Sequence, residues 1–257
     1  DRFDADTVYA AFDDHKSGDY SPYLLKSTDR GRSWTSIADD LPERHLVWRI
    51  EQDHLAPGLL FAGTEFGLFT SLDGGGHWLK LSGNAPTIPF RDLAIQRREN
   101  DLVGATFGRG FWVLDDYSPL RELSEERLEA EAFLLFDVRP ALLYVQDDVL
   151  GGLRGSQGDA YFVADNPPYG AAFTYYLRDA LQTSEEQRKE HEQELAEEGA
   201  DTPYPGWAAL KDEAREEAPS LVFEVRDANG ELVDRVAGKT EAGLHRVNWE
   251  LRYAPFT

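Results

Sequence analysis

The chain has 257 residues, with 48 Asp and Glu against 26 Lys and Arg, which gives a formal net charge of −22. That balance argues against binding to a nucleic-acid phosphate backbone, which requires basic patches. The absence of Cys excludes disulfides, thiolate metal sites and a Cys nucleophile. No apolar run approaches the roughly 20 residues of a membrane-spanning helix, so no membrane span is predicted.

The sequence also lacks Met, so we expect a processed form or a piece of a longer protein, with any signal peptide in missing N-terminal sequence. Only six of the 26 basic residues are Lys. Few Lys beside many carboxylates is typical of proteins that work in high salt, where repulsion between like charges is screened. The alternative interpretation is an ordinary acidic protein from a GC-rich genome.

Short runs rich in β-forming residues recur through the first 124 residues and predict three consecutive units of strands. The first unit has predicted strands at residues 7–12, 23–27 and 34–37. The second has four, at residues 46–53, 59–64, 67–72 and 78–82. The third is predicted to have strands at residues 91–96, 102–106, 110–115 and about 120–123.

The first two units share a stretch with the pattern S-x-D-x-G-x-x-W, and a repeat period of about 40–50 residues is typical of propeller blades. Its members are Ser27, Asp29, Gly31 and Trp34, and again Ser71, Asp73, Gly75 and Trp78. Each aspartate is predicted to accept hydrogen bonds from backbone N–H groups two or three residues on, and each glycine to allow a positive φ. Each Trp begins the outgoing strand and offers its ring to a neighbouring sheet. We therefore interpret both aspartates as structural residues of a turn.

The second half of the chain predicts more strands. A linker at residues 122–131 precedes an apolar stretch at 133–145, a Gly-rich loop at 147–158, and strands at 160–164 and 171–177. Asn229-Gly230 lies between two apolar runs, 221–226 and 231–233, and is typical of a β-hairpin. A last strand is expected at 244–253, with Trp249 and Leu251 on one face.

A Glu-rich insertion interrupts these strands at about residues 184–218. Its composition predicts a capped helix from Ser184 to about Glu198 and a second helix at residues 208–217. We interpret the insertion as a solvated helical segment, with a partner-binding arm as the alternative.

The repeated stretch resembles the Asp-box, or bacterial neuraminidase repeat, of sialidases, xyloglucanases and sortilin-type receptors. The chain is similar in particular to large bacterial proteins labelled glycosyl hydrolases, which carry a sortilin-like propeller followed by a β-sandwich. Residues 63–69, 107–116, 166–170 and 243–249 carry the rest of that resemblance. It implies a secreted protein, located in the extracellular space or the periplasm.

These patterns together predict an all-β fold in two domains. Residues 1–124 would be the last two to three blades of an Asp-box β-propeller, and the third unit lacks the repeated turn, as expected where a chain leaves a repeat. Residues 125–257 would be a fibronectin type III-like β-sandwich that carries the helical insertion. Because so few blades cannot close a propeller, the remaining blades would come from missing sequence or from another chain.

The candidate binding residues lie in the loops expected on the ligand-binding face of the propeller. They are Glu65, Phe66 and Arg109, and Glu65 is also the candidate catalytic acid. Glu65 and Arg109 occupy corresponding loops of adjacent units. We interpret them either as a functional pair, an acid beside an Arg that binds a sugar or a carboxylate, or as a salt bridge between units.

An oxygen-rich loop holds Asp13, Asp14, Ser17 and Asp19, which are residue types that ligate Ca²⁺. The spacing does not follow the EF-hand pattern, so a solvated loop is the simpler interpretation and no cofactor is predicted. The six His residues are scattered, without metal-ligand spacing.

The leading hypothesis is a non-catalytic binding or scaffolding protein that recognises a peptide, protein or glycan on the propeller face. The alternative is a secreted glycoside hydrolase whose active site lies partly in missing blades. Glycoside hydrolysis usually needs two carboxylates flanking the scissile bond, and 48 acidic residues offer too many candidates to single out a pair. Neither the Arg cluster with a Tyr nucleophile of sialidases nor the paired Asp of xyloglucanases can be assembled from these units. A third interpretation is that the chain only holds a larger assembly together.

Overall fold

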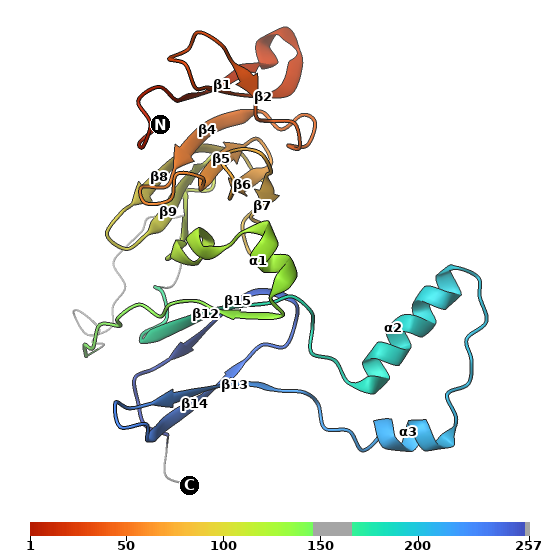
Figure 1. Cartoon of the computed structure of the whole chain (residues 1–257). Helices are drawn as coiled ribbons and strands as arrows, with labels where there is room; N and C mark the ends of the chain where they lie inside the picture. The colour runs from red at the N-terminus through yellow and green to blue at the C-terminus, as the bar shows by residue number, and fades with distance from the viewer. Residues whose placement is uncertain (146–165, 255–257) are drawn as a thin grey trace. The chain divides into compact units, whose positions relative to one another are not determined.

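The computed structural model describes residues 1–145 and 166–254 (Figure 1). These residues form mostly antiparallel β-sheet with three α-helices, as expected of an all-β chain. The chain divides into two compact units, Asp1–Arg127 and Leu128–Thr257, close to the expected boundary after residue 124. The predicted loop at 147–158 and strand at 160–164 lie outside the described residues. None of the helices in the described ranges combines the length and apolar character needed to cross a bilayer.

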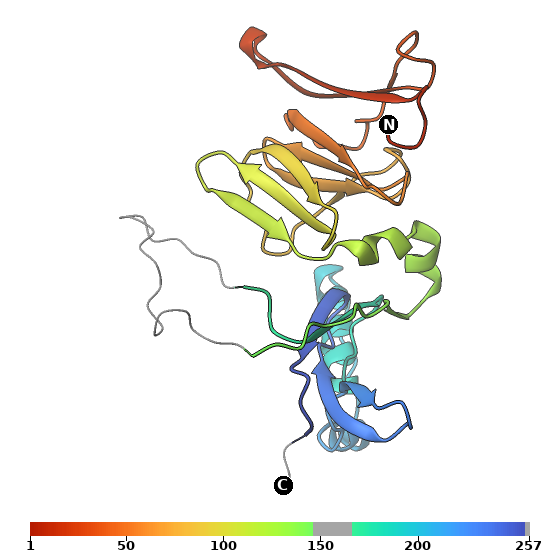
Figure 2. The same ribbon diagram turned by 90° about the vertical axis from the view of Figure 1, so that its left-hand side faces the viewer.

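The first unit contains three sheets in chain order, drawn from red through orange to yellow in Figure 2. The first sheet is formed by β1 (Val8–Asp14), β2 (Asp19–Ser27) and β3 (Thr35–Ser36). The second is formed by β4 (Val47–Gln52), β5 (Leu60–Thr64), β6 (Gly67–Ser71) and β7 (Leu79–Lys80). The third is formed by β8 (Phe90–Gln96), β9 (Asp101–Thr106) and β10 (Phe111–Leu114). A short 3₁₀ helix, η1 (His15–Ser17), connects β1 to β2.

The central strands of the middle sheet, β5 and β6, are buried on both faces, which explains why the residues of β5 are apolar or small. Successive side chains of a strand point to opposite faces. Leu60 and Ala62 accordingly pack towards the first sheet, whereas Leu59 and Phe61 pack towards the third. Phe90 and Leu93 of β8 complete the second of these clusters. The three sheets are therefore held together by two continuous apolar layers.

The turn after β2 is closed by Asp29. Its Oδ1 accepts hydrogen bonds from the backbone N–H groups of Arg32 and Ser33, at 2.9 and 2.8 Å, and from Ser27 Oγ at 2.8 Å. These donors lie three and four residues after the aspartate, one residue further than the sequence predicted. Hydrogen bonds from Ser33 hold the pKa of Asp29 at about 2, so the carboxylate is ionised when it makes these contacts.

The turn after β6 repeats the arrangement around Asp73, which accepts hydrogen bonds from the N–H groups of Gly76 and His77. The glycine shared by the two turns has a positive φ in both, 81° at Gly31 and 99° at Gly75, as predicted. The ring of Trp78 is buried against the first sheet, and its Nε1–H donates to the carbonyl of Ile37 at 2.7 Å. The ring of Trp34 is instead 42 % exposed, and its Nε1–H donates to Gly31 within its own turn, so the predicted packing on a neighbouring sheet is confirmed for Trp78 and not for Trp34. The repeated residues therefore shape both turns, and Trp78 also joins the second sheet to the first.

The segment after β10 does not form the strand predicted at 120–123. It forms the 3₁₀ helix η2 (Ser118–Glu122), because Pro119 at its start has no N–H to donate to a sheet. This helix places Arg121 beside Asp53, whose buried carboxylate accepts from Arg121 Nε at 2.9 Å and Nη2 at 2.8 Å. Tyr117 donates to the same carboxylate at 2.6 Å. The polar cluster of Asp53, Tyr117 and Arg121 thus ties the end of β4 to the segment that follows the third sheet.

The second unit begins in α1 (Glu125–Ala130) and contains two small sheets. One sheet is formed by β11 (Phe133–Leu135), β12 (Ala171–Leu177) and β15 (Gly243–Trp249), and the other is the hairpin of β13 (Leu221–Arg226) and β14 (Leu232–Gly238). Tyr175, Leu177 and Phe223 form the buried core between them. The predicted hairpin at Asn229-Gly230 is confirmed, with Gly230 at a φ of 87°.

Two predicted strands of this unit are shorter than expected. Of the apolar stretch 133–145, only Phe133–Leu135 forms a strand in the described chain, and it pairs with β12 over three residues. The last strand ends at Trp249, and Leu251 has a left-handed φ of 58°, so the prediction that Trp249 and Leu251 share one strand face is wrong.

The acidic insertion forms two helices, α2 (Ser184–Glu197) and α3 (Trp207–Glu213), as predicted. The N-cap of α2 is Thr183, whose side chain accepts from the N–H of Glu186 while the Glu186 carboxylate accepts from the N–H of Thr183. This reciprocal capping box fixes the first helical residue at Ser184, as predicted, with the N-cap one residue before it.

Candidate functional site

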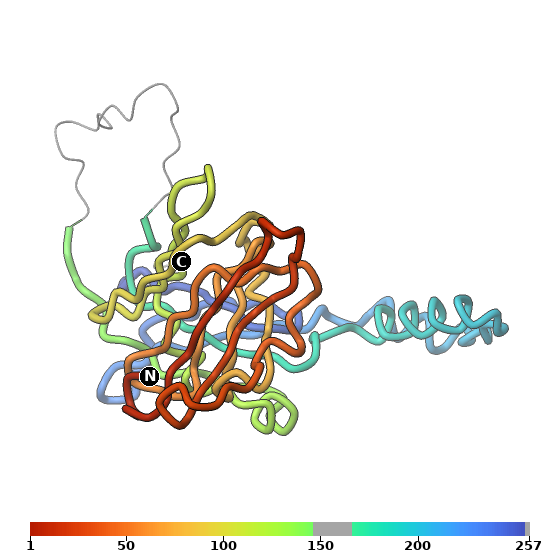
Figure 3. The backbone as a smooth tube through the Cα atoms, turned by 90° about the horizontal axis from the view of Figure 1, so that it is seen from above, coloured from red at the N-terminus to blue at the C-terminus, as the bar shows by residue number. Residues whose placement is uncertain are grey.

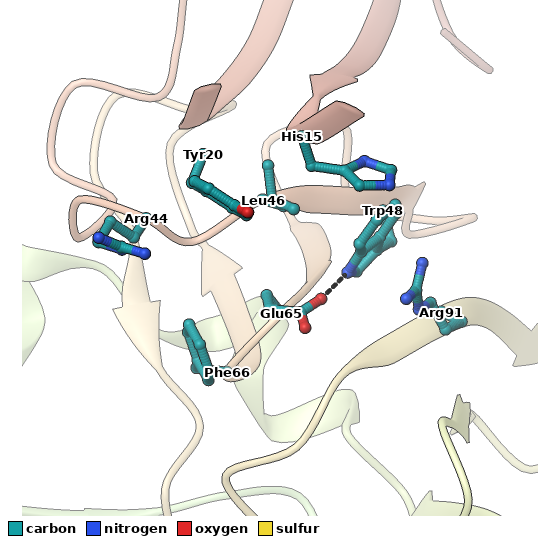
Figure 4. Close-up of a pocket in the computed structure, with 8 residues that line it drawn as sticks. All are labelled: His15, Tyr20, Arg44, Leu46, Trp48, Glu65, Phe66 and Arg91. Carbon is teal, nitrogen blue, oxygen red and sulfur yellow. Dashed lines mark hydrogen bonds between the residues drawn. The ribbon is translucent and has the colours of Figure 1, made fainter. Parts of the chain in front are cut away.

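A pocket of about 180 Å³ opens in the first unit, where loops and strand ends of all three sheets meet (Figure 4). Its walls combine four rings with two guanidinium groups and one carboxylate. The lining residues are His15, Tyr20, Arg44, Leu46, Trp48, Glu65, Phe66 and Arg91. It lies in the part of the first unit where ligand-binding loops were expected, and it includes two of the three candidate binding residues.

Two lining residues, Trp48 and Arg91, occupy equivalent positions in consecutive sheets. In β4, Val47 pairs with Thr64 and Arg49 with Gly63, which leaves Trp48 as the extra residue of a β-bulge. In β8, the same irregularity leaves Arg91 as the extra residue between Phe90 and Asp92. Because a bulge re-aims the side chain of its extra residue, it explains how both side chains reach the pocket.

These two bulged residues stack on each other. The guanidinium carbon of Arg91 lies 3.6 Å from the centre of the Trp48 ring and 5.5 Å from the centre of the Phe107 ring. No described carboxylate forms an ion pair with Arg91. A guanidinium that lies over an indole ring can still offer its N–H edge to planar acceptors such as carboxylates and amides.

Glu65 is held by the same indole. Its Oε2 accepts a hydrogen bond from Trp48 Nε1 at 2.8 Å, and its backbone N–H donates to the carbonyl of Leu46. In the third sheet, the N–H of Phe107 makes the equivalent bond to Pro89, so Phe107 stands where the second sheet has Glu65. The carboxylate position of this site is therefore not repeated in the next unit.

The opposite side of the pocket repeats the pairing of a cation with a ring. Arg44 lies 5.1 Å from the centre of the Tyr20 ring, and its backbone has a left-handed φ of 65°, which is uncommon for a residue other than Gly. Figure 4 shows Arg44 and Arg91 on opposite sides, with Glu65 between them. Phe66 packs edge-on against His45, and its ring is exposed at the rim.

The predicted pairing of Glu65 with Arg109 is not present. Among the described residues, Glu65 bonds to Trp48, and Arg109 neither lines the pocket nor forms an ion pair. The stacked cation comes instead from Arg91, in a strand rather than in the predicted loop. The sequence offered one signal for this, since Trp48 and Arg91 each follow an apolar residue, Val47 or Phe90, at the start of β4 or β8.

The three candidate calcium ligands do not converge. Asp13 contacts Nδ1 of His15, Asp14 accepts from Ser17, and Asp19 accepts from Tyr23 and from the N–H of Ser21. The described part of the chain holds no group of three acidic or His side chains arranged to bind a metal ion. Asp13 instead contacts the imidazole of His15, a ring that lines the pocket and packs edge-on against Trp48.

The chemistry of the pocket suits binding through ring faces and guanidinium edges. Among its described lining residues, Glu65 carries the one carboxylate, and that carboxylate already accepts the indole N–H. An acid-base pair that cleaves a glycosidic bond needs two carboxyl groups on either side of the bond. In comparisons with known proteins, neither a family model nor a curated protein matches the chain.

Proposed function

We propose that the first unit is part of an Asp-box β-propeller and that its pocket binds a peptide, protein or glycan without catalysing a reaction on it. Three consecutive antiparallel sheets, two of them closed by the same aspartate-centred turn, support this architecture. The second unit would be the accompanying fibronectin type III-like sandwich. As in secreted proteins with such repeats, the site would face the extracellular space or the periplasm.

The stacked pair of Arg91 and Trp48 is the observation that carries the proposal. The chain has 48 acidic residues, yet this guanidinium meets ring faces and no described carboxylate. With so many carboxylates in the chain, an ion pair within the chain would be the ordinary partner for the Arg91 guanidinium. The guanidinium stacks on Trp48 near the exposed ring of Phe107, and its donors make no ion pair in the described chain, so they are available to a ligand. Arg and aromatic residues are those that most often dominate binding energy.

We would test this with the full chain on printed arrays of peptides and glycans, comparing the wild type with Arg91→Ala. The dissociation constant of the variant for the selected ligands is expected to rise at least about tenfold. The variant loses both the bidentate donor and the guanidinium that lies over the Trp48 ring. Arg98→Ala is the matched control. It makes the same change of charge in the same unit, and the Arg98 side chain is 82 % exposed and pairs with its sequence neighbour Glu99.

Ligands that bind Arg91→Ala and wild type equally would contradict the proposed site. Every glycan selected on the array would also be assayed for release of reducing sugar. Release that stops in Glu65→Gln would establish the hydrolase alternative and overturn non-catalytic binding. Retention of intact glycan by wild type, with weakened binding in Arg91→Ala, is the result that we expect.

A further inference from the structure

We propose that the acidic insertion is a docking arm for an Arg- and Lys-rich segment of a partner protein. Its contact surface is an exposed aromatic pair, Tyr204 and Trp207, whose rings meet edge to face at 6.3 Å. Tyr204 is 65 % exposed and Trp207 is 75 % exposed. Figures 1 and 3 show α2 and α3 lying beside each other, apart from the strands of the same unit.

The exposure of this pair is the first reason to assign it to a partner. Trp is buried in most folded proteins, and each large aromatic ring offers about 150–250 Å² of surface for burial. Neither α2 nor α3 contributes a buried residue to the core of its own unit. The rings therefore add nothing to the packing of the fold, whereas clustered exposed aromatic residues mark interaction sites.

The arm is also held in a defined shape by polar contacts. Arg188 of α2 makes two hydrogen bonds of 2.8 Å to the carboxylate of Glu213 in α3, and a third of 2.7 Å to Glu192. Gly206, with a left-handed φ of 91°, lets the chain turn into α3, so that Trp207 is the first residue of that helix. A surface that is already ordered loses less conformational entropy when it binds.

Charge selects the kind of partner. Residues 184–217 include 12 Asp and Glu against four Lys and Arg, and two of those four cations are already paired within α2 and α3. Several acidic residues of the arm form no ion pair within the described chain, among them Glu198, Asp201, Asp212 and Glu217. A guanidinium or ammonium group resting on the face of Trp207 would gain both the cation–π attraction and these carboxylates.

The test measures binding of the full chain to a fluorescent peptide in which Arg alternates with Gly, by anisotropy at about physiological ionic strength. Trp207→Ala is expected to weaken binding about tenfold without changing the net charge, and Trp207→Phe to restore part of it. The control is Phe111→Ala, which removes an aromatic ring of similar exposure, 74 %, from the first unit. Far-UV circular dichroism would check that α2 and α3 remain helical in every variant.

Equal affinity of wild type and Trp207→Ala would overturn the proposal, since attraction by net charge alone would then account for binding. Equal losses in Phe111→Ala and Trp207→Ala would overturn it as well, because they would place the effect outside the arm. No detectable binding by wild type would have the same consequence. The pocket around Arg91 lies in the other unit, so this outcome is independent of the array experiment.

Discussion

Replacement of Asp53 by Asn is expected to lower the free energy of unfolding of the first unit by about 3–5 kcal/mol. The Arg121 side chain is only 14 % exposed, and it would lose its charged partner while remaining buried. Burial opposes ionisation of Asp53, but hydrogen bonds from Arg121, Tyr117 and two backbone N–H groups outweigh it and hold its pKa below the ordinary value. Because the folded-state pKa is the lower one, this stabilisation is present at neutral pH and is lost as the pH falls through the acidic range.

The measurement is urea unfolding followed by tryptophan fluorescence, since four of the six Trp residues lie in the first unit. Asp92→Asn is the matched control, because Asp92 also pairs with an Arg, Arg49, but both side chains are largely exposed. We expect it to cost less than about 1 kcal/mol. The double variant Asp53→Asn/Arg121→Gln should lose less than the sum of its two single changes. Equal effects of Asp53→Asn and Asp92→Asn would contradict this account of the cluster.

Replacement of Gly170 by Ala is expected to have a comparably large effect on the second unit. Gly170 has a left-handed φ of 115°, and an added Cβ would lie 1.9 Å from the carbonyl oxygen of Trp249. Both the backbone strain and the clash with a backbone atom oppose the substitution, which we expect to cost about 2–5 kcal/mol. Loss of hydrogen-exchange protection at the amides of β12 and β15 is the measurement, because Ala171 and Trp249 are paired at this end.

Gly230→Ala separates the two causes. Gly230 also has a left-handed φ, 87°, but an added Cβ would meet no atom within 4 Å. Its substitution should cost only the strain, about 1–2 kcal/mol. If the two variants lost equal stability, the close approach of Gly170 to Trp249 would not be what requires glycine there.

Strands with strong local signals could be predicted from the sequence, and elements set by distant contacts could not. The strands β5 and β6 match their predicted ranges to within one residue, because both faces are buried and their residues are apolar or small. The segment 120–123 offers two Leu residues to a strand, but Leu120 packs into the core from a 3₁₀ turn that Tyr117 and Arg121 anchor to Asp53. Nothing local to the segment indicates that anchor.

The candidate site shows the same division. Glu65 and Phe66 were found because they occupy a short loop between two recognisable strands. Trp48 and Arg91 were missed because a β-bulge, rather than strict alternation along the strand, determines where their side chains point. Arg109 was preferred to Arg91 because position in a loop was the available guide. A search for equivalent residues at the start of β4 and β8 would have found the stacked pair.

The most direct test of the proposed binding site is the indole N–H resonance of Trp48 in the nitrogen-15 spectrum of the full chain. The indole N–H of Trp48 donates a hydrogen bond to Glu65, and the guanidinium of Arg91 lies over the indole ring. Assignment would use Trp48→Phe, and the ligand would be one selected on the arrays. We predict that titration shifts the Trp48 resonance in proportion to occupancy while that of Trp34, in the first turn, stays in place. A saturating ligand that left the Trp48 resonance unmoved would contradict the account.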